Sequence, residues 1–348
     1  MTAFRLARAS DDVAVRSLLR ENGLPSWVEI TIEREPSFFA GADWLGREWA
    51  AIGEDGSDIV GLYTAALRPA HVNGRQERLG YLGGLRVDRR HRHRIRHLRD
   101  GYDSIRALAP AQGTLPWWFS VIAEGNVAAR RLVEAGLPGL PAYRWQGDYA
   151  TFVLPASRGR RLGLWRIARR DEGVDIVSLH NRQAARYHCS PVLDVATVER
   201  IGFDRFLVYE RDGRMLGTVA VWDQSAFKQV VARRYRRPLG ALLPAYNLYA
   251  RLNRHVPLPP VGRALGQTFL AFLALADATA PGIEALLRDA LSHCRTPVAV
   301  LGLHAQHPWA QILGRFRPIR YPARVYAVSF GAPVELDPRP VQPEAALL

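Results

Sequence analysis

The sequence contains the stretch Phe4-Arg-Leu-Ala-Arg-Ala-Ser-Asp-Asp-Val13 and repeats its pattern as Trp165-Arg-Ile-Ala-Arg-Arg-Asp-Glu-Gly-Val174. Each copy reads as a short strand and a polar helix start, followed by apolar residues at helical spacing. Both copies continue to a Ser-Leu pair, at Ser17-Leu18 and at Ser178-Leu179. Two similar stretches at the start of two half-chains indicate an internal repeat, which determines how every other element is interpreted.

Four further pairs of segments match in the same order along the chain. They are 54–61 with 210–217, 81–87 with 269–275, 116–123 with 297–304, and 148–151 with 325–328. The first pair predicts a hairpin, because an acidic turn with glycine separates two apolar runs. The next two pairs predict strands that each lead into a helix, and the last pair opens a final strand. Five matches in one order predict two copies of one α/β unit.

The repeat sets the expected organisation of the chain. We expect an α/β (α+β) fold of two tandem units, at 1–155 and 163–331, joined by an Arg/Gly-containing connection. The second unit carries an insertion at about 231–263 that is rich in Arg, Pro and Tyr. Residues 332–348, which include four prolines, are expected to form an extended tail with little structure.

Length and composition exclude several classes of protein. The chain has 348 residues, of which 48% are hydrophobic and 23% charged, a globular composition long enough for two domains of about 150 residues. Apolar runs such as 268–276 reach only half of the ~20 residues that a membrane-spanning helix needs. The first residues show no secretory pattern. Two cysteines exclude a disulfide framework and fit a reducing compartment, so we expect a cytoplasmic protein.

The formal net charge of +14 is carried almost entirely by arginine, because Lys228 is the one lysine among 47 basic residues. Such a bias is typical of a GC-rich genome, so part of the arginine content has no functional meaning. A basic surface attracts nucleic acid, anionic lipid or a small polyphosphate ligand. We favour an anionic small molecule, because the arginines cluster in one short stretch of the first unit.

That stretch reads Leu85-Arg-Val-Asp-Arg-Arg-His-Arg-His-Arg-Ile-Arg-His-Leu98. It resembles the acyl-CoA signature of the GNAT N-acetyltransferase superfamily, in which a strand ending in Val precedes an Arg/Gln-x-x-Gly-x-Gly/Ala loop and a helix. Glu124-Gly-Asn-Val-Ala-Ala-Arg-Arg-Leu-Val-Glu-Ala-Gly136 resembles the later Asn-x-x-Ala-x-x-Leu-Tyr-x-x-x-Gly segment of that family. The resemblance follows the order of elements over 1–154 and, more faintly, over 163–330. It implies two tandem GNAT-like domains, each with a mixed, mostly antiparallel sheet flanked by helices.

The resemblance implies acetyl-CoA, or another acyl-CoA, as co-substrate and no metal. The residues that it places at the cofactor are Leu85, Val87, Arg92, Arg94, Arg96, His97 and Asn126. A helix N-terminus binds pyrophosphate through its unpaired N–H groups. Ile95 and His97 stand where the family has glycines, so arginine side chains would supply the phosphate contacts. The alternatives are a solvated basic helix start for the arginines, and a purely capping role for Asn126.

Acid and base are missing from their usual positions in the family. Gly83 and Gly84 stand where the family places a strand Glu, and Val133 stands in place of the helix Tyr. Transfer to an amine needs a proton acceptor and often an acid for the leaving thiolate. The sequence offers Glu124, acting through water, as the base and Tyr81 as the acid. The alternative for Glu124 is a surface ion pair with Arg130 or Arg131.

Together these features predict an acyl-CoA-dependent N-acyltransferase that acts directly on a small-molecule or peptide amine. The acceptor is expected to enter over 23–27, Phe38, Phe39 and Trp44, unless these aromatic residues only build the core. A non-catalytic acyl-CoA-binding or scaffold protein is the first alternative, and a basic nucleic-acid-binding protein the second. For the 231–263 insertion we expect a surface helix that covers a domain interface. The alternative is a segment that binds nucleic acid or an anionic membrane. His91, His93 and His97 alternate with arginines, which disfavours a metal site.

Overall fold

A computed structural model describes residues 3–23, 27–44, 46–91, 95–108, 115–276, 280–331 and 334–348. The strands are β1 (Ala3–Leu6), β2 (Val28–Glu33), β3 (Arg47–Asp55), β4 (Asp58–Val72), β5 (Arg75–Val87), β6 (Trp117–Ala123), β7 (Ala142–Pro155), β8 (Trp165–Ile167), β9 (Ser190–Pro191), β10 (Phe206–Arg211), β11 (Arg214–Asp223), β12 (Gln229–Tyr235), β13 (Gln267–Leu275), β14 (Val298–His304) and β15 (Ile319–Ser329). The α-helices are α1 (Asp12–Glu21), α2 (Ile95–Leu108), α3 (Val127–Glu134), α4 (Gly173–Ala184), α5 (Val195–Ile201), α6 (Leu239–Asn253), α7 (Ala280–Ser292) and α8 (Trp309–Gly314).

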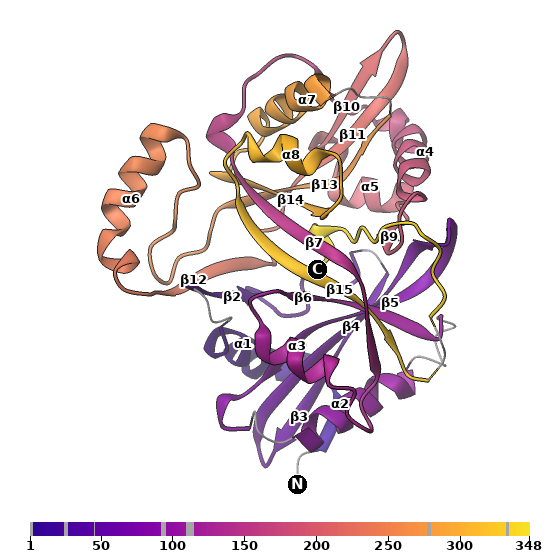
Figure 1. Ribbon diagram of the computed structural model, residues 1–348, viewed down its shortest axis with the longest axis vertical. Coiled ribbons are helices and arrows are strands. Elements are labelled where there is room, and N and C mark those ends of the chain that lie inside the picture. Colours follow the sequence, from indigo (N-terminus) through magenta and orange to yellow (C-terminus); the bar gives the residue numbers. More distant parts are fainter. Residues whose placement is uncertain are drawn as a thin grey trace.

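Within the described residues, thirteen strands form one mixed sheet that runs through the whole molecule (Figure 1). Its order is β1-β3-β4-β5-β6-β15-β7-β14-β13-β11-β10-β8, with β9 paired to β4. The order reads the same from both ends once each strand is replaced by its counterpart in the other half. The directions agree as well, because β5–β6 and β13–β14 are parallel pairs and the other pairs along this order are antiparallel. The sheet therefore has the twofold pattern that the sequence repeat predicts.

The last strand of each half lies in the other half. β7 pairs with β14 of the second half, and β15 pairs with β6 of the first half. β7 and β15 also pair with each other, from Ala142 opposite Ser329 to Val153 opposite Ile319. The two copies are therefore joined by exchanged strands at the centre of the sheet. The residue boundaries 1–155 and 163–331 stay a prediction. Because each half contains the last strand of the other, no cut at one residue number separates the two halves.

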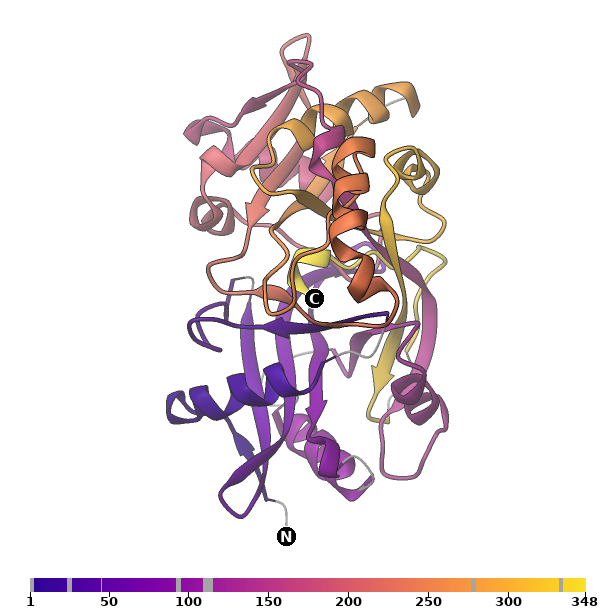
Figure 2. The ribbon, with the colours of Figure 1, turned by 90° about the vertical axis from the view of Figure 1, so that its left-hand side faces the viewer.

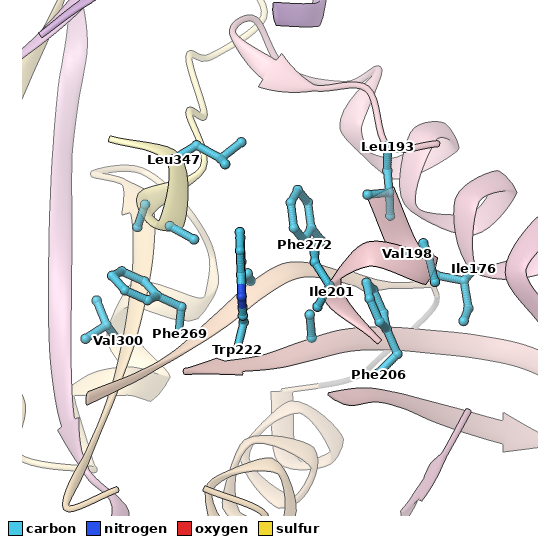
Figure 3. Packing of buried hydrophobic residues seen from close by; sticks show 14 of the residues in the cluster. Ile176, Leu193, Val198, Ile201, Phe206, Trp222, Phe269, Phe272, Val300 and Leu347 are labelled. Carbon is cyan, nitrogen blue, oxygen red and sulfur yellow. The ribbon is translucent and has the colours of Figure 1, made fainter. Parts of the chain in front are cut away.

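Helices cover both faces of each half, because successive strand residues point to opposite faces. In the first half, α1 packs on Ala50, Ile52 and Leu62, whereas α2 packs on Ala51 and Tyr63. In the second half, α4 and α5 cover one face and α7 and α8 the other. Figure 3 shows the first of these second-half cores, where Trp222 and Phe272 lie among residues of β10, β13 and α5. In these layers the apolar residues that recur every 3.6 positions in the helices pack on those that recur every two positions in the strands.

The C-terminal tail is extended, as expected, but it is far from a loose arm. It runs through the centre of the molecule, where Val341, Ala345, Ala346 and Leu347 are buried, and it contains one 3-10 helix, Ala345–Leu347. Leu347 enters the core of the second half beside Phe269 and Trp222 (Figure 3). The described tail has little regular secondary structure, and its apolar residues after Pro340 bury against both halves.

The insertion forms β12 and α6. β12 pairs with β2 of the first half in a separate two-stranded sheet, so this strand joins the two halves. α6 stands at the side of the molecule, away from the large sheet (Figures 1 and 2). The expected surface helix is present, but β12 rather than α6 makes the contact between the halves. No helix in the described part of the chain is both long enough and apolar enough to cross a membrane.

Candidate functional site

The candidate site begins where the parallel strands β5 and β6 separate. Their register contains two pairs, Gly80 with Trp118 and Tyr81 with Phe119, although both strands continue beyond this point. On its other side, β5 shifts register against β4 between Leu62 and Thr64, and Gly84 adopts a φ of 61°. Such a bulge bends a strand away from its neighbour. The main chain of β5 after Tyr81 therefore diverges from β6, which leaves an edge that a ligand with amide groups can pair with.

The second half repeats this arrangement. β13 and β14 pair in parallel from Gln267–Val298 to Phe269–Val300, and β13 then shifts register against β11. Phe272 takes a φ of 53° at the position of the repeat that corresponds to Gly84. Both halves thus contain the same divergence of two parallel strands, and the segments 81–87 and 269–275 that match in sequence carry it.

The tail fills the divergence in the second half. The Phe272 N–H donates to Glu344 Oε2 at 2.9 Å. Gln342 bridges to β14, since its Nε2 donates to the Gly302 carbonyl at 2.8 Å and its Oε1 accepts from the His304 N–H at 2.7 Å. Burial raises the pKa of Glu344. A cavity of about 330 Å³ remains beside this plug, lined by residues that include Tyr187, Trp309 and Glu344. Three main-chain groups at this divergence, the N–H groups of Phe272 and His304 and the Gly302 carbonyl, are therefore bonded by the tail.

The predicted cofactor residues that the structure describes lie at or after the carboxyl ends of β5 and β6. Leu85 and Val87 are partly buried and pack on the core under α2, so they support the helix start rather than project from it. Arg92 and Arg94 lie outside the described residues. Arg96 and His97 belong to α2, whose side chains at these positions are outside the description. The structure thus places the strand ends and the helix, and the arginine contacts stay a prediction.

Asn126 begins α3, and its Oδ1 accepts a hydrogen bond from the Ala129 N–H at 3.3 Å. The capping role that Asn favours is therefore present. Glu124 lies between β6 and α3, is exposed, and donates its main-chain N–H to the Pro322 carbonyl at 2.8 Å. Among the described residues, neither Arg130 nor Arg131 forms an ion pair with Glu124. Both candidates lie at the entrance of the divergence, beside the start of α3.

Tyr81 lies at the inner end of the divergence. Its ring packs on Phe119 with centroids 5.0 Å apart, and the Arg68 guanidinium lies 5.6 Å from the ring centroid. Burial raises the pKa of Tyr81 to about 12, against the opposing effect of Arg68. A Cβ on Gly83 would lie 2.7 Å from the Tyr81 hydroxyl oxygen, so glycine leaves room for this side chain. The missing strand carboxylate therefore has a structural cause: Gly83 accommodates Tyr81, and Gly84 forms the bulge.

The structure separates the two predicted catalytic residues. Tyr81 is level with Phe119 on β6, and Glu124 follows Phe119 by five residues. At about 3.3 Å per strand residue, Glu124 lies roughly 16 Å beyond the level of Tyr81. The two side chains therefore face opposite ends of the same divergence and cannot act directly on one atom.

A charged cluster lies next to Tyr81, where the two halves and the tail meet. We call it the central cluster: Arg34, Glu48, Arg68 and Lys228. Arg34 and Glu48 form an ion pair at 2.6 Å. Arg68 donates to the Leu347 carbonyl at 2.5 Å, and Lys228 donates to the main-chain oxygen of Leu348. These residues line a cavity of about 30 Å³, enough for about one water molecule.

Lys228 is the functional candidate that the sequence analysis missed. Burial lowers its pKa to about 7, and the nearby Arg34 and Arg68 contribute to the shift. A lysine with a pKa near neutrality can accept or donate a proton in catalysis. One feature of the sequence could have pointed to Lys228: it is the one lysine in an arginine-rich chain.

Trp44 is the predicted acceptor residue that the structure brings to the central cluster, since it lines the same cavity. Phe38 is buried in the core beside α1, and Phe39 packs on that core, as the alternative predicted. Trp27 is exposed, with 64% of its surface accessible. Within the described ranges, no group of three or more His, Cys, Asp or Glu side chains is placed to hold a metal ion.

Comparison with known proteins identifies the fold. No family model matches the sequence, and no curated protein matches it. The structure is similar to Saccharomyces cerevisiae N-myristoyltransferase with bound myristoyl-CoA, with a TM-score of 0.61 and 11% identity over 94% of this chain and 82% of that chain. It is also similar to a GCN5-related N-acetyltransferase from Anabaena variabilis, with a TM-score of 0.52 and 8% identity over 94% and 72%. The chain thus has a GNAT-like fold in a tandem arrangement, as its sequence resemblance implies.

Proposed function

We propose that this protein is an acyl-CoA-dependent N-acyltransferase that transfers an acyl group directly to an amine. The observation that carries the proposal is the divergence of β5 and β6 at Tyr81, with its bulge at Gly84. In the second half Glu344 and Gln342 bond to the main chain at the corresponding place, which favours the first half as the cofactor site. A similar fold holds myristoyl-CoA in the yeast enzyme.

The cofactor would lie along the divergence with its thioester inside and its phosphates outside. The pantetheine amides would pair with the main chain of β5 as an added strand does. The pyrophosphate would meet the start of α2, where Arg92, Arg94, Arg96 and His97 add charge-assisted contacts. Leu85 and Val87 hold the strand under that helix, and Asn126 lies at the start of α3 on the same side.

The reaction joins the acceptor nitrogen to the thioester carbon, breaks the carbon–sulfur bond and releases CoA. Tyr81 would protonate the leaving thiolate, since a pKa of about 12 keeps its hydroxyl protonated at neutral pH. The ammonium group of the acceptor loses one proton to a base before attack, and the second proton that the nitrogen loses as the amide forms restores the Tyr81 hydroxyl. Glu124 would fill this role only through a chain of water molecules, because it lies at the outer end of the divergence.

The identity of the acyl group is part of the proposal. The sequence favours acetyl-CoA, whereas the yeast neighbour binds a fourteen-carbon acyl chain, as its bound myristoyl-CoA shows. The acceptor is a small-molecule or peptide amine, and Trp44 marks its approach beside the central cluster. The two cysteines, both free, fit action in the cytoplasm.

Calorimetry with acetyl-CoA, myristoyl-CoA, desulfo-CoA and free CoA tests the proposal. Arg92→Ala with Arg94→Ala should weaken CoA binding at least tenfold, since each charge-assisted contact contributes about 1.5–3 kcal/mol. The matched control is Arg211→Ala with Arg214→Ala, two arginines at the hairpin between β10 and β11. Equal CoA affinity in the wild type and the folded Arg92/Arg94 double variant would place the cofactor elsewhere.

A non-catalytic acyl-CoA-binding or scaffold protein is the second candidate. It is favoured by the glycines at positions 83 and 84 and by the distance of Glu124 from Tyr81. A protein that binds acyl-CoA and transfers the acyl group to no amine, in a broad screen of acceptors, has this second function.

A further inference from the structure

The outer face of α6 is apolar, although it faces away from the protein. Six exposed residues form this outer stripe: Ala241, Leu242, Ala245, Leu248, Tyr249 and Leu252. At 100° per residue, they occupy about a third of the helix circumference. Leu248 and Leu252 expose 61% and 74% of their surface. A surface helix of a soluble protein normally turns polar residues outward, so this arrangement is inverted.

The inner face of α6 is already occupied by the chain itself. Tyr246 donates its hydroxyl hydrogen to the Val256 carbonyl at 2.9 Å. Asn247 exchanges two hydrogen bonds of 2.9 Å with the main chain of Leu258, and Ala250 is buried. These contacts fix the rotation of the helix about its axis. The outer stripe is therefore held outward by specific bonds.

The unpaired charge around the stripe is positive, whereas Arg233 and Arg234 of β12 are ion-paired with Glu33 and Glu29 of β2. Residues 225–276 contain eight basic residues and no Asp or Glu. Arg236, Arg237, Arg251, Arg254 and Arg263 are exposed, and none of them forms an ion pair with a carboxylate of the described residues. Arg158, whose guanidinium donates to the Asn253 and Arg254 carbonyls, adds a further positive charge at the end of the helix. An apolar stripe within such a field fits a surface that is negative outside and apolar inside.

An exposed tryptophan lies beside the beginning of this segment. The Arg236 N–H donates to the Trp27 carbonyl at 3.0 Å, which holds Trp27 near the start of α6. Trp, Leu and Arg together are typical of helices that lie in the interface of a bilayer. Arginine also binds phosphate in a bidentate geometry.

We infer that α6 docks the protein on an anionic phospholipid surface, with the outer stripe in the acyl region and the arginines at the phosphates. This inference goes beyond the proposed acyl transfer and does not depend on it. Nucleic acid fits less well, because binding to a phosphate backbone does not require exposed leucines. A second copy of the chain fits less well too, because the arginines around the two stripes would repel each other.

Co-sedimentation of the full chain with vesicles of phosphatidylglycerol and phosphatidylcholine tests the inference. The wild type should bind at 50 mM salt, bind at least tenfold more weakly to pure phosphatidylcholine, and lose affinity at 500 mM salt. Leu248→Ser with Leu252→Ser should weaken binding at least tenfold. Arg236→Ser with Arg237→Ser should weaken vesicle binding by about fivefold per residue, which corresponds to about 1 kcal/mol for each arginine.

The matched control is Val13→Ser with Val174→Ser, since these two valines are single exposed apolar residues on α1 and α4. It should bind vesicles as the wild type does. An unchanged thermal midpoint shows that each variant is folded. Three results would overturn the inference: no vesicle binding by the wild type, equal binding by the Leu248/Leu252 variant, or a wild-type dimer that this variant dissociates without any effect of lipid.

Discussion

At the scale of single residues, Tyr81 and its glycines explain an apparent defect of the sequence. Gly83 and Gly84 stand at the positions where the GNAT superfamily, which the sequence resembles, places a strand carboxylate. The first makes room for the Tyr81 ring, and the second takes the left-handed conformation of the bulge. A side chain at either position would clash, with Tyr81 at Gly83 and with Thr64 at Gly84. The two glycines therefore have structural reasons, and under the proposed function Tyr81 rather than a strand carboxylate would serve the reaction.

Tyr81→Phe should lower kcat for acyl transfer by about 10²-fold and leave the affinity for CoA within a factor of two, because it removes only the acid. Glu124→Gln should lower kcat by a smaller factor than Tyr81→Phe, because Glu124 would take the proton of the acceptor only through a chain of water molecules. Steady-state kinetics of both variants gives the comparison. The reverse order of effects would make Glu124 the base and remove Tyr81 from the mechanism.

Lys228 should make stability depend on pH between about 7 and 10. Its pKa is lowered to about 7 in the folded chain, so the unfolded chain binds more protons in this range and stability rises with pH. Below pH 7 Lys228 is charged in both the folded and the unfolded chain, so the folded chain bears the full free-energy cost of burying that charge. Urea unfolding at pH 6.5, 8.5 and 10 should show that Lys228→Met reduces this rise by a few kcal/mol. If the free energy of unfolding changed with pH equally in the wild type and in Lys228→Met, the lowered pKa of Lys228 would be contradicted.

At the scale of elements, the two halves share an ion-pair motif as well as a strand order. Arg5 of β1 binds Asp11 at 2.7 Å and Glu54 at 2.6 Å. Arg166 of β8 binds Glu172 and Glu210 in the same way. Each arginine ties a first strand to the start of its helix and to the neighbouring strand. The two halves therefore use the same ion-pair arrangement of one arginine and two carboxylates at the same place in the repeat.

This motif predicts a loss of stability in acid. Hydrogen bonds from Arg5 and Arg166 lower the pKa values of Asp11 and Glu172 to about 2. Their contribution is present above pH 4 to 5 and is lost as the pH falls towards 2. Asp11→Asn and Glu172→Gln should each lower the Tm at pH 7 and leave it nearly unchanged at pH 2. Asp171→Asn is the control, because the Asp171 side chain is 80% exposed; an equal effect of this control would refute the assignment.

At the scale of the whole molecule, the exchange of β7 and β15 makes the halves depend on each other. Without β15, β6 loses its partner on one side, and without β14, β7 loses its own. The tail adds to this dependence, since it plugs the second half and reaches the central cluster of the first. Strand pairing, rather than a connecting linker, therefore joins the two copies.

The chain should consequently unfold as one cooperative unit. Hydrogen exchange in urea should give the same midpoint for β3–β5 and β10–β13. A fragment of residues 1–158 should fail to unfold cooperatively when it is expressed alone. Co-expression with residues 159–348 should restore the exchange protection of β6. Two separate midpoints, or a stable isolated fragment, would show that the exchanged strands contribute little.

The sequence by itself determined the repeat and the α/β layers, because these follow from periodicity and from local matches such as Phe4–Val13 with Trp165–Val174. The tandem GNAT-like fold was implied by the resemblance of 85–98 and 124–136 to the motifs of that superfamily. The sequence also indicated Tyr81, Asn126 and the ends of β5 and β6 as site residues, which stays a prediction. Only the tertiary structure decided that β7 and β15 change places, that Glu344 plugs one of two equivalent divergences, and that Lys228 meets Arg34 and Arg68. These features join residues that are far apart in the chain, and long-range pairing depends on how surfaces fit rather than on any local pattern.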